Sequence, residues 1–337
     1  MSITKGRAVT ISDVAQAAGV SRAAVSKVIR NAYGVSPAMR SRVEAAIEDL
    51  GYRPSVAARA LRGSSYRLGL EVPYVSAFMT QIVEGAKRAV AGTPYQLVLA
   101  PADGPEHGTF ESLADGIVDG IIAVAPLVDP AWLEDLATRV PVVMLGRHDR
   151  PTGYDTVVGD DYAGTRAVMD HLLTLGHRRI AHLTEAETMT VPGCGTPHAI
   201  RLEVYRTCLA EAGLAELTRV ARRDHTPDSA QRVTARLLAQ PDPPTAIFAG
   251  HDDIALGVLA AVAAAGRRGS VAVVGYDNTD MAAHPLIDLT SVDQEGVEMG
   301  SQAATMLLER LQGRTEPRSW TATTTLTVRG STMPPAA

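Results

Sequence analysis

Most of the chain alternates short apolar runs with longer segments in which apolar residues recur every three or four positions. Seven apolar runs are bounded by turn residues: RLGLEV, QLVLA, VDGIIAVA, PVVMLG, RIAHL, TAIFAG and VAVVGY. A helical pattern near residues 78–91 separates the first two. Continuous apolar strands alternating with helices are typical of parallel sheets covered on both faces. Seven strands are too many for one compact sheet, so we expect two doubly wound lobes with ligands at the carboxyl ends of the strands.

The first fifty residues have a different pattern, which predicts three short helices from their end signals. Thr10 and Asp13 have the spacing of a capping box, and Gly19 suits a left-handed helix end. Apolar residues spaced for one face of this first helix are Val14, Ala15 and Ala18.

A second helix is predicted to begin after Ser21, and a third at Ser36–Pro37 with its end at Gly51. The inward residues expected are Val25, Val28 and Ile29 in the second helix, and Val43, Ala46, Ile47 and Leu50 in the third. Two helices joined by a tight turn and followed by a bracing helix form the helix-turn-helix plan.

The next segment, GYRPSVAARALRGSS, can form a short helix from Pro54 to Arg62, followed by a flexible joint at residues 63–65. So short a helix is unstable alone in water, because nucleation costs more than the few hydrogen bonds return. We therefore expect this segment to become ordered only when a partner such as DNA holds it.

Charge is divided unevenly along the 337 residues, whose length suggests two or three domains. Residues 1–62 hold 10 Lys and Arg against 4 Asp and Glu, whereas the remaining residues hold 22 against 33. Such asymmetry indicates either a polyanion-binding appendage on an acidic body or a solvated basic face, and charge alone does not separate these readings.

Several classes of protein lack support in the sequence. No apolar segment matches a secretory signal or the ~20 residues of a membrane helix, so we expect a cytoplasmic protein. Cys194 and Cys208 form no CxxC pair, which argues against a disulfide framework or a zinc site. The phosphate-loop, HExxH and GxSxG motifs are absent, so we expect neither an enzyme nor a cofactor.

Two stretches near the start and four further on carry a resemblance to a known family. They are VTISDVAQAAGVSRAAVSKVIRN, VSPAMRSRVEAAIEDLGYRPSVAARALR, DDYAGTRAVMDHLLTLGHRRIAHL, PTAIFAGHDDIALG, VAVVGYD and LTSVDQEGVEMG. In this order they closely resemble the LacI/GalR (lactose-repressor-like) family, over about residues 9–332. The resemblance implies an all-α helix-turn-helix DNA-binding head and an α/β periplasmic-binding-protein-like body of two doubly wound parallel-sheet lobes. The domains expected are residues 1–51 for the helix-turn-helix, 52–66 for the hinge, 67–162 plus 295–322 for the N-lobe and 163–294 plus 323–333 for the C-lobe.

In that family the second helix lies in the major groove, which places Arg22, Ala23 and Lys27 toward base edges. Arginine can donate to guanine O6 and N7, lysine can reach guanine, and alanine can touch a thymine methyl group. The alternative is that Arg22 and Lys27 face solvent or contact phosphates only. Further DNA-binding residues expected are Thr10, Ser21, Ser26 and Asn31, as phosphate contacts or helix caps, and Tyr52. Arg30 departs from the asparagine that usually follows the recognition helix.

The hinge resembles a family segment that enters the minor groove. Leu61 matches a leucine wedged into a base step, and Ala58 matches a small residue that lets two hinge helices approach. A wedge unstacks a step and bends the duplex, and contacts on the bent DNA offset that cost. Alternatively, Leu61 packs against the body.

Positions that match the family's ligand contacts are Arg201, His251, Asp277 and Gln294. A carboxylate accepts from two hydroxyls and a guanidinium donates in a fixed fork, which suits a polyhydroxylated ligand. An Arg–Asp pair that only ties the lobes together is the competing interpretation. Other expected effector-binding residues are Tyr74, Phe78, Arg147 and His225. A sugar or sugar derivative fits best, and the arginines and histidines leave an anionic ligand open.

The hypothesis is a homodimeric transcription regulator whose affinity for a near-palindromic double-stranded DNA operator is controlled by a small molecule in the inter-lobe cleft. Repression relieved by an inducer is favoured over corepression. A free-standing small-molecule-binding protein, such as a transport receptor, is the alternative, but it needs a secretory signal and no basic head. A sugar-processing enzyme with an accessory DNA-binding domain is a third reading.

Overall fold

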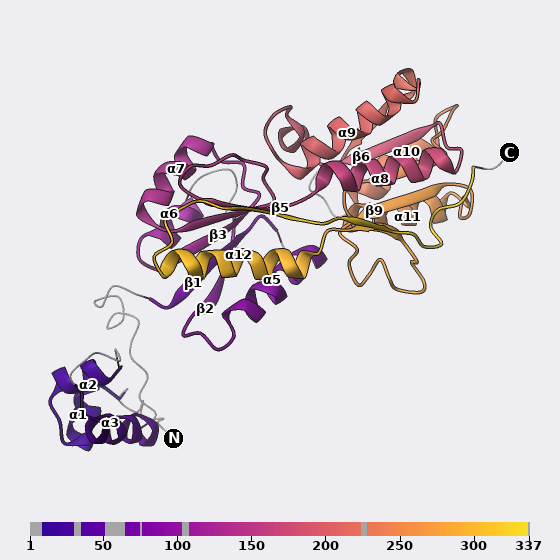
Figure 1. Ribbon diagram of the computed structural model, residues 1–337. Helices are drawn as coiled ribbons and strands as arrows, with labels where there is room; N and C mark the ends of the chain where they lie inside the picture. The colour runs from indigo at the N-terminus through magenta and orange to yellow at the C-terminus, as the bar shows by residue number, and fades with distance from the viewer. Residues whose placement is uncertain are drawn as a thin grey trace. The chain divides into compact units, whose positions relative to one another are not determined.

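The computed structural model describes residues 9–29, 35–50, 65–74, 76–102, 108–223 and 228–335. The chain divides between Ser65 and Tyr66 into two compact units, which we call the head and the body (Figure 1). Within the described residues, no helix combines the length and apolar character needed to span a membrane.

The head is formed by three helices, α1 (Ile11–Ala18), α2 (Arg22–Ile29) and α3 (Pro37–Asp49). Thr10 and Asp13 form the predicted capping box, and Gly19 closes α1 in the left-handed region at φ 63°. Ser21 Oγ accepts from the backbone N–H of Ala24 at 3.1 Å, and Ser36 caps α3. The end signals in the sequence thus placed the starts of all three helices correctly.

The head has a small apolar core to which each helix contributes. Its buried residues are Val14, Ala15, Ala18, Val25, Val28, Val43 and Ala46. The prediction that Leu50 points into this core is wrong, because α3 ends at Asp49 and the Leu50 cap residue is 36% exposed. Gly51, the predicted helix end, and the hinge segment up to residue 64 lie outside the described residues.

The first lobe of the body contains a six-stranded, wholly parallel sheet with strand order β11-β5-β4-β3-β1-β2. Its strands are β1 (Arg67–Val72), β2 (Gln96–Pro101), β3 (Gly120–Val124), β4 (Val142–Leu145), β5 (Asp155–Gly159) and β11 (Ser319–Ala322). Helices α5 (Ala77–Val90) and α12 (Gly296–Leu311) cover one face, and α6 (Gly108–Ala114) and α7 (Pro130–Arg139) cover the other.

The second lobe repeats this plan with strand order β12-β10-β9-β8-β6-β7, in which only β12 is antiparallel. Its strands are β6 (Ile180–Thr184), β7 (Arg219–Arg222), β8 (Ala246–Ala249), β9 (Ala272–Tyr276), β10 (Thr290–Asp293) and β12 (Thr325–Thr327). Helices α8 (Asp161–Thr174) and α9 (Pro197–Glu211) cover one face, and α10 (Ser229–Leu238) and α11 (Asp252–Ala264) the other. Two short 3₁₀ turns, η1 (Glu187–Thr190) and η2 (Ala215–Leu217), flank α9.

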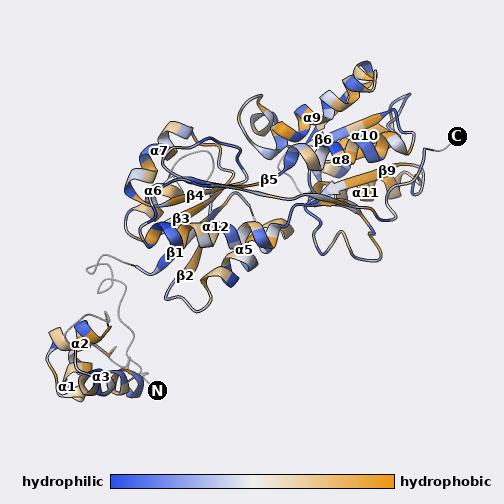
Figure 2. Cartoon of the chain, viewed as in Figure 1, coloured by the Kyte–Doolittle hydropathy of each residue, from blue (hydrophilic) through white to orange (hydrophobic). Residues whose placement is uncertain are grey.

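The described chain passes between the lobes three times: from β5 to α8, from β10 to α12, and from β11 to β12. All seven apolar runs form strands, and these strands are hydrophobic along most of their length (Figure 2). The sequence did not predict β5, β7, β10, β11 or β12.

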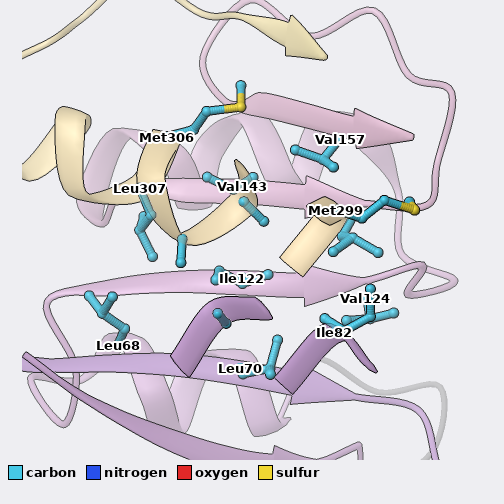
Figure 3. Close-up of a cluster of buried hydrophobic side chains, with 14 of the residues drawn as sticks. Leu68, Leu70, Ile82, Ile122, Val124, Val143, Val157, Met299, Met306 and Leu307 are labelled. Carbon is cyan, nitrogen blue, oxygen red and sulfur yellow. The ribbon is translucent and has the colours of Figure 1, made fainter. Parts of the chain in front are cut away.

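One of the two apolar cores of the first lobe lies between its sheet and the α5–α12 pair (Figure 3), and the other lies under α6 and α7. Leu70, Ile122 and Val143 from three strands meet Met299 and Leu307 from α12. The two helices approach closely at Gly85 and Gly300, where a Cβ atom would lie 1.8 Å and 2.1 Å from backbone oxygens of the facing helix. Only glycine fits at these two positions, so the crossing of α5 and α12 is set by backbone contact.

One acid is buried in this lobe without a charged partner. Glu71 lies in β1, is 2% exposed, and its Oε2 has no hydrogen-bond partner among the described residues. Burial raises the pKa of Glu71 from 4.5 to about 7, although a backbone hydrogen bond at Val124 opposes the shift. The native state therefore retains a proton that the unfolded chain has already lost at pH 5–7.

This proton makes stability depend on pH. Because the folded pKa is raised, the native state binds more protons than the unfolded state, so stability falls by about 3 kcal/mol as pH rises from 4.5 to 7. We expect Glu71→Gln to remove most of that fall, measured as the urea midpoint at pH 5 and pH 8. Glu111→Gln, a change at an exposed acid on α6, is the control, and equal pH dependence in wild type and Glu71→Gln would contradict the assignment.

Candidate functional site

The second helix of the head presents one polar face to solvent. Arg22, Ala23 and Lys27 are exposed, while Val25 and Val28 on the other side are buried in the core. This division follows from helical periodicity, since residues three or four apart share a face. An exposed guanidinium and an ammonium on one short helix can donate hydrogen bonds to a nucleic acid without disturbing the core.

The other sequence-predicted residues of the head divide into two groups. Thr10 and Ser21 act as helix caps in this structure, and Ser26 is half-buried in α2. The remaining four, Asn31, Tyr52, Ala58 and Leu61, lie outside the described residues.

A cavity of about 80 Å³ lies in the body where residues of both lobes converge. We call it the cleft. It is bordered by residues that follow the carboxyl ends of strands, such as Ala125 after β3, Gly146 after β4 and Asp277 after β9. Six of the eight effector-binding residues predicted from the sequence line it: Tyr74, Phe78, Arg201, His251, Asp277 and Gln294.

Arg201, on α9, is held by three buried groups. Its Nε donates to Asp161 Oδ1 at 2.8 Å, its Nη1 donates to the Gly250 carbonyl at 2.6 Å, and its guanidinium lies 3.5 Å from the ring centre of Tyr276. His148 Nε2 donates to the other oxygen of Asp161 at 2.8 Å. Burial alone would raise the pKa of Asp161, but the charge of Arg201 and the hydrogen bond from His148 hold it below its usual value.

Asp277 lies at the carboxyl end of β9 in a strained backbone conformation. Its φ of 108° is unfavourable for a residue with a Cβ, a feature that recurs at functional sites. Gln294 Nε2 donates to Asp277 Oδ1 at 2.6 Å, which joins the second lobe's sheet to the segment that leads into α12. Burial and the nearby Asp252 raise the pKa of Asp277 well above its ordinary value.

His251 caps α11 and connects to a charged pair. Its Nδ1 accepts from the backbone N–H of Ile254 at 3.4 Å, so Nε2 carries the hydrogen and donates to Glu185 Oε1 at 2.8 Å. Arg223 Nε also donates to Glu185 Oε1 at 2.7 Å, and its Nη2 lies 2.6 Å from the same oxygen as an ion pair. These hydrogen bonds keep the pKa of Glu185 low despite its burial. The Tyr74 ring lies 6.5 Å from that of His251, on the other side of the cleft.

Two predicted effector residues are not in the cleft lining. Arg147 is buried, and its Nη1 donates to the carbonyls of Pro126 and Val128 at 2.9 and 2.8 Å while Asp149 pairs with its charge. A buried guanidinium needs acceptors, and here the adjacent loop of its own lobe supplies them. His225 lies outside the described residues.

The sequence reasoning missed three buried polar residues in or beside the cleft: Asp161, Glu185 and His198. Glu185 directly follows β6, so a charged residue after a predicted apolar strand was the available signal for it. Asp161 lies just beyond β5, a strand that the sequence did not predict. His198, in the first turn of α9, has no comparable signal in the sequence. The competing interpretation paired an arginine with an aspartate, Arg201 with Asp277. In the structure these two residues have other partners: Arg201 donates to Asp161, and Asp277 accepts from Gln294.

We expect Arg201→Met to destabilise the protein by about 3 kcal/mol, because it leaves the Asp161 carboxylate buried without its charged partner. Urea unfolding at pH 7 measures the change. Adding Asp161→Asn should recover at least half of the loss, since the double variant buries no unpaired charge. The assigned pairing would be contradicted if Arg201→Met were as stable as wild type, or if the double variant were less stable than Arg201→Met alone.

Two families match this chain. Residues 10–55 match "Bacterial regulatory proteins, lacI family", and residues 169–332 match "Periplasmic binding protein-like domain". The chain is similar to the HTH-type transcriptional regulator CelR of Thermobifida fusca, with 35% identity over 342 residues that cover 96% of this chain and 98% of the relative. It is also similar to the ribose operon repressor of Escherichia coli (strain K12), with 31% identity covering 90% of this chain and 93% of the relative.

Two solved structures of lacI-type regulators are similar to this chain over nearly its whole length. The lac repressor dimer bound to operator and the anti-inducer ONPF matches with a TM-score of 0.80 at 28% identity, covering 97% of this chain and 100% of that chain. A CelR–cellobiose complex matches with a TM-score of 0.69 at 34% identity, covering 96% of this chain and 100% of that chain.

Proposed function

Because the chain belongs to the lacI family of bacterial regulatory proteins, we propose that it binds a two-fold symmetric DNA operator as a homodimer under the control of a small molecule in the cleft. Membership makes the chain a DNA-binding transcription regulator and not an enzyme. The relative of known structure bound to operator is a dimer, and two-fold protein symmetry suits a palindromic site with one half-site per head.

The observation that carries the proposal is the solvent-exposed face of α2. Arg22 reads guanine with a bidentate pair, Lys27 reaches a second base or a phosphate, and Ala23 contacts a thymine methyl group. Thr10, Ser21, Ser26, Asn31 and Tyr52 position the head on the sugar–phosphate backbone. Leu61 serves as a minor-groove wedge, with Ala58 allowing the two hinge segments to approach.

The effector we propose is a sugar or sugar derivative, as for the relative solved with cellobiose. Asp277 accepts hydrogen bonds from ligand hydroxyls, Arg201 and His251 provide further polar contacts, and Tyr74 and Phe78 cover the sugar ring. Small-molecule sites usually have volumes of ~300–1,000 Å³. A cavity of about 80 Å³ therefore requires the lobes or their loops to move apart when a sugar enters.

Such movement can change the affinity for DNA only if the ligand binds one arrangement of the lobes more tightly than the other. The coupling free energy between the two sites is usually about 1–3 kcal/mol. We favour repression that is relieved by an inducer.

The working domain limits are residues 1–51 for the DNA-binding domain, 52–66 for the hinge, 67–162 plus 295–322 for one lobe and 163–294 plus 323–333 for the other. As a bacterial DNA-binding regulator, the protein acts in the cytoplasm.

Selection from random double-stranded DNA with the full chain should enrich a near-palindromic site. On that site Arg22→Ala should reduce discrimination against one substituted base pair by about 1–3 kcal/mol, because it removes a bidentate contact. Arg42→Ala, an exposed change on α3, is the matched control and should leave base preference unaltered. Competition binding at fixed salt measures both variants.

Failure of the selection to enrich any sequence over random DNA would refute sequence-specific binding. Equal base preference in wild type and Arg22→Ala would refute only the role of Arg22. Leu61→Glu tests the hinge separately, since operator affinity that survives this change is incompatible with a wedge.

A further inference from the structure

Three guanidiniums in or beside the cleft, those of Arg201, Arg223 and Arg147, are already engaged by the protein. Arg201 donates to Asp161 and to the Gly250 carbonyl, and Arg223 donates to Glu185 and forms an ion pair with it. Arg147 donates to two backbone carbonyls and pairs with Asp149. A phosphate or carboxylate that entered the cleft would have to displace one of these partners to gain a guanidinium.

The histidines do not supply a replacement cation. His198 lines the cleft, and burial lowers its pKa to about 3, so its ring is neutral at physiological pH. His251 has both ring nitrogens engaged, since Nδ1 accepts a backbone N–H and Nε2 donates to Glu185. Neither ring therefore offers a free charged donor to a ligand.

Acceptors are in excess. Three buried carboxylates, those of Asp161, Glu185 and Asp277, face two guanidiniums, those of Arg201 and Arg223. Asp161 and Glu185 each have an ion pair, whereas Asp277 receives its hydrogen bond from the neutral amide of Gln294. The cleft thus has an acidic group without an ion pair of its own, and the pKa of that group is raised by burial and by the nearby Asp252.

His198 adds a second, independent observation. Its side chain belongs to a residue that is only 9% exposed, and its Nδ1 has no hydrogen-bond partner among the described residues. Buried polar atoms are normally hydrogen-bonded, so this nitrogen indicates a partner supplied by a ligand or by water. A neutral imidazole exchanges hydrogen bonds with hydroxyls and gives a phosphate no charge compensation.

We propose that the cleft selects an uncharged, hydroxyl-bearing ligand over its phosphorylated or carboxylated counterpart, and that His198 helps determine this specificity by a hydrogen bond to a ligand hydroxyl. The inference rests on the proposed effector function and narrows it, because it removes the anionic ligand that the sequence left open. Anions are disfavoured because the guanidiniums of Arg201 and Arg223 already have acceptors, while Asp277 offers a hydrogen bond to a hydroxyl and no charge compensation to an anion.

Isothermal titration of the full chain with two matched pairs of probes tests the selection. The pairs are cellobiose against cellobionate and D-ribose against D-ribose 5-phosphate. The uncharged member of the pair that binds should bind at least about tenfold more tightly than its anionic member, because the anion would lose its hydration in a cleft whose guanidiniums already have acceptors.

The role of His198 is tested with His198→Leu and His198→Asn. Leucine removes the polar atom and should weaken binding of the neutral sugar about tenfold. Asparagine restores a polar atom near the position of Nδ1 and should keep the affinity within about threefold of wild type. The thermal midpoint and operator affinity of both variants without sugar should match wild type, which a general folding defect would not allow.

The outcomes separate this inference from the proposed function. An anionic probe that binds as tightly as its neutral partner overturns the selection while leaving a sugar effector in place. Equal affinity of the Leu, Asn and wild-type proteins for the neutral sugar overturns the role of His198. Binding of none of the four probes by a chain that still recognises its operator overturns the proposed sugar effector, and this inference with it.

Discussion

The cleft depends on how Arg201 is held. Its guanidinium joins the beginning of α8 through Asp161, the end of β8 through the Gly250 carbonyl and the end of β9 through the Tyr276 ring. Each contact offsets part of the cost of burying a charge, which the interior tolerates only when the charge is paired and hydrogen-bonded. Because these elements come from separate parts of the chain, the second lobe must be folded before the site exists.

The same constraint explains why the buried guanidiniums near the cleft leave little positive charge for a ligand. Guanidiniums that are buried near a ligand site must find acceptors within the protein, and once they have done so they are no longer free to attract an anion. Arg147 illustrates this, since the carbonyls of Pro126 and Val128 hold it away from the cleft. Counting arginines in the sequence therefore overestimated the positive charge available to a ligand.

The head is stabilised differently, because it is too small to bury a large hydrophobic core. Seven buried apolar side chains are combined with caps on each helix, so that local hydrogen bonds supplement a limited hydrophobic contribution. Caps are local features of the sequence, and they identified the starts of the helices correctly. The position of Leu50 was not predictable in this way, because its exposure depends on where α3 ends in relation to the packed core.

The sequence by itself determined the helix-turn-helix, the seven apolar strands and the two-lobed plan, because these follow from capping residues and hydrophobic periodicity that act over a few positions. It also identified six residues of the cleft, through resemblance to a family with a common strand order. Five strands, β5, β7, β10, β11 and β12, were not predicted. Length is not the reason, since β4 and β8 also have only four residues, but those two are wholly apolar. The missed strands are interrupted by polar residues and therefore form no continuous apolar run. Only the tertiary structure decided that Arg201 pairs with Asp161, that Arg147 points into its own lobe, and that His198 and Glu185 belong beside the cleft. These are contacts between residues distant in the chain, and no local pattern encodes which acceptor a buried guanidinium will meet.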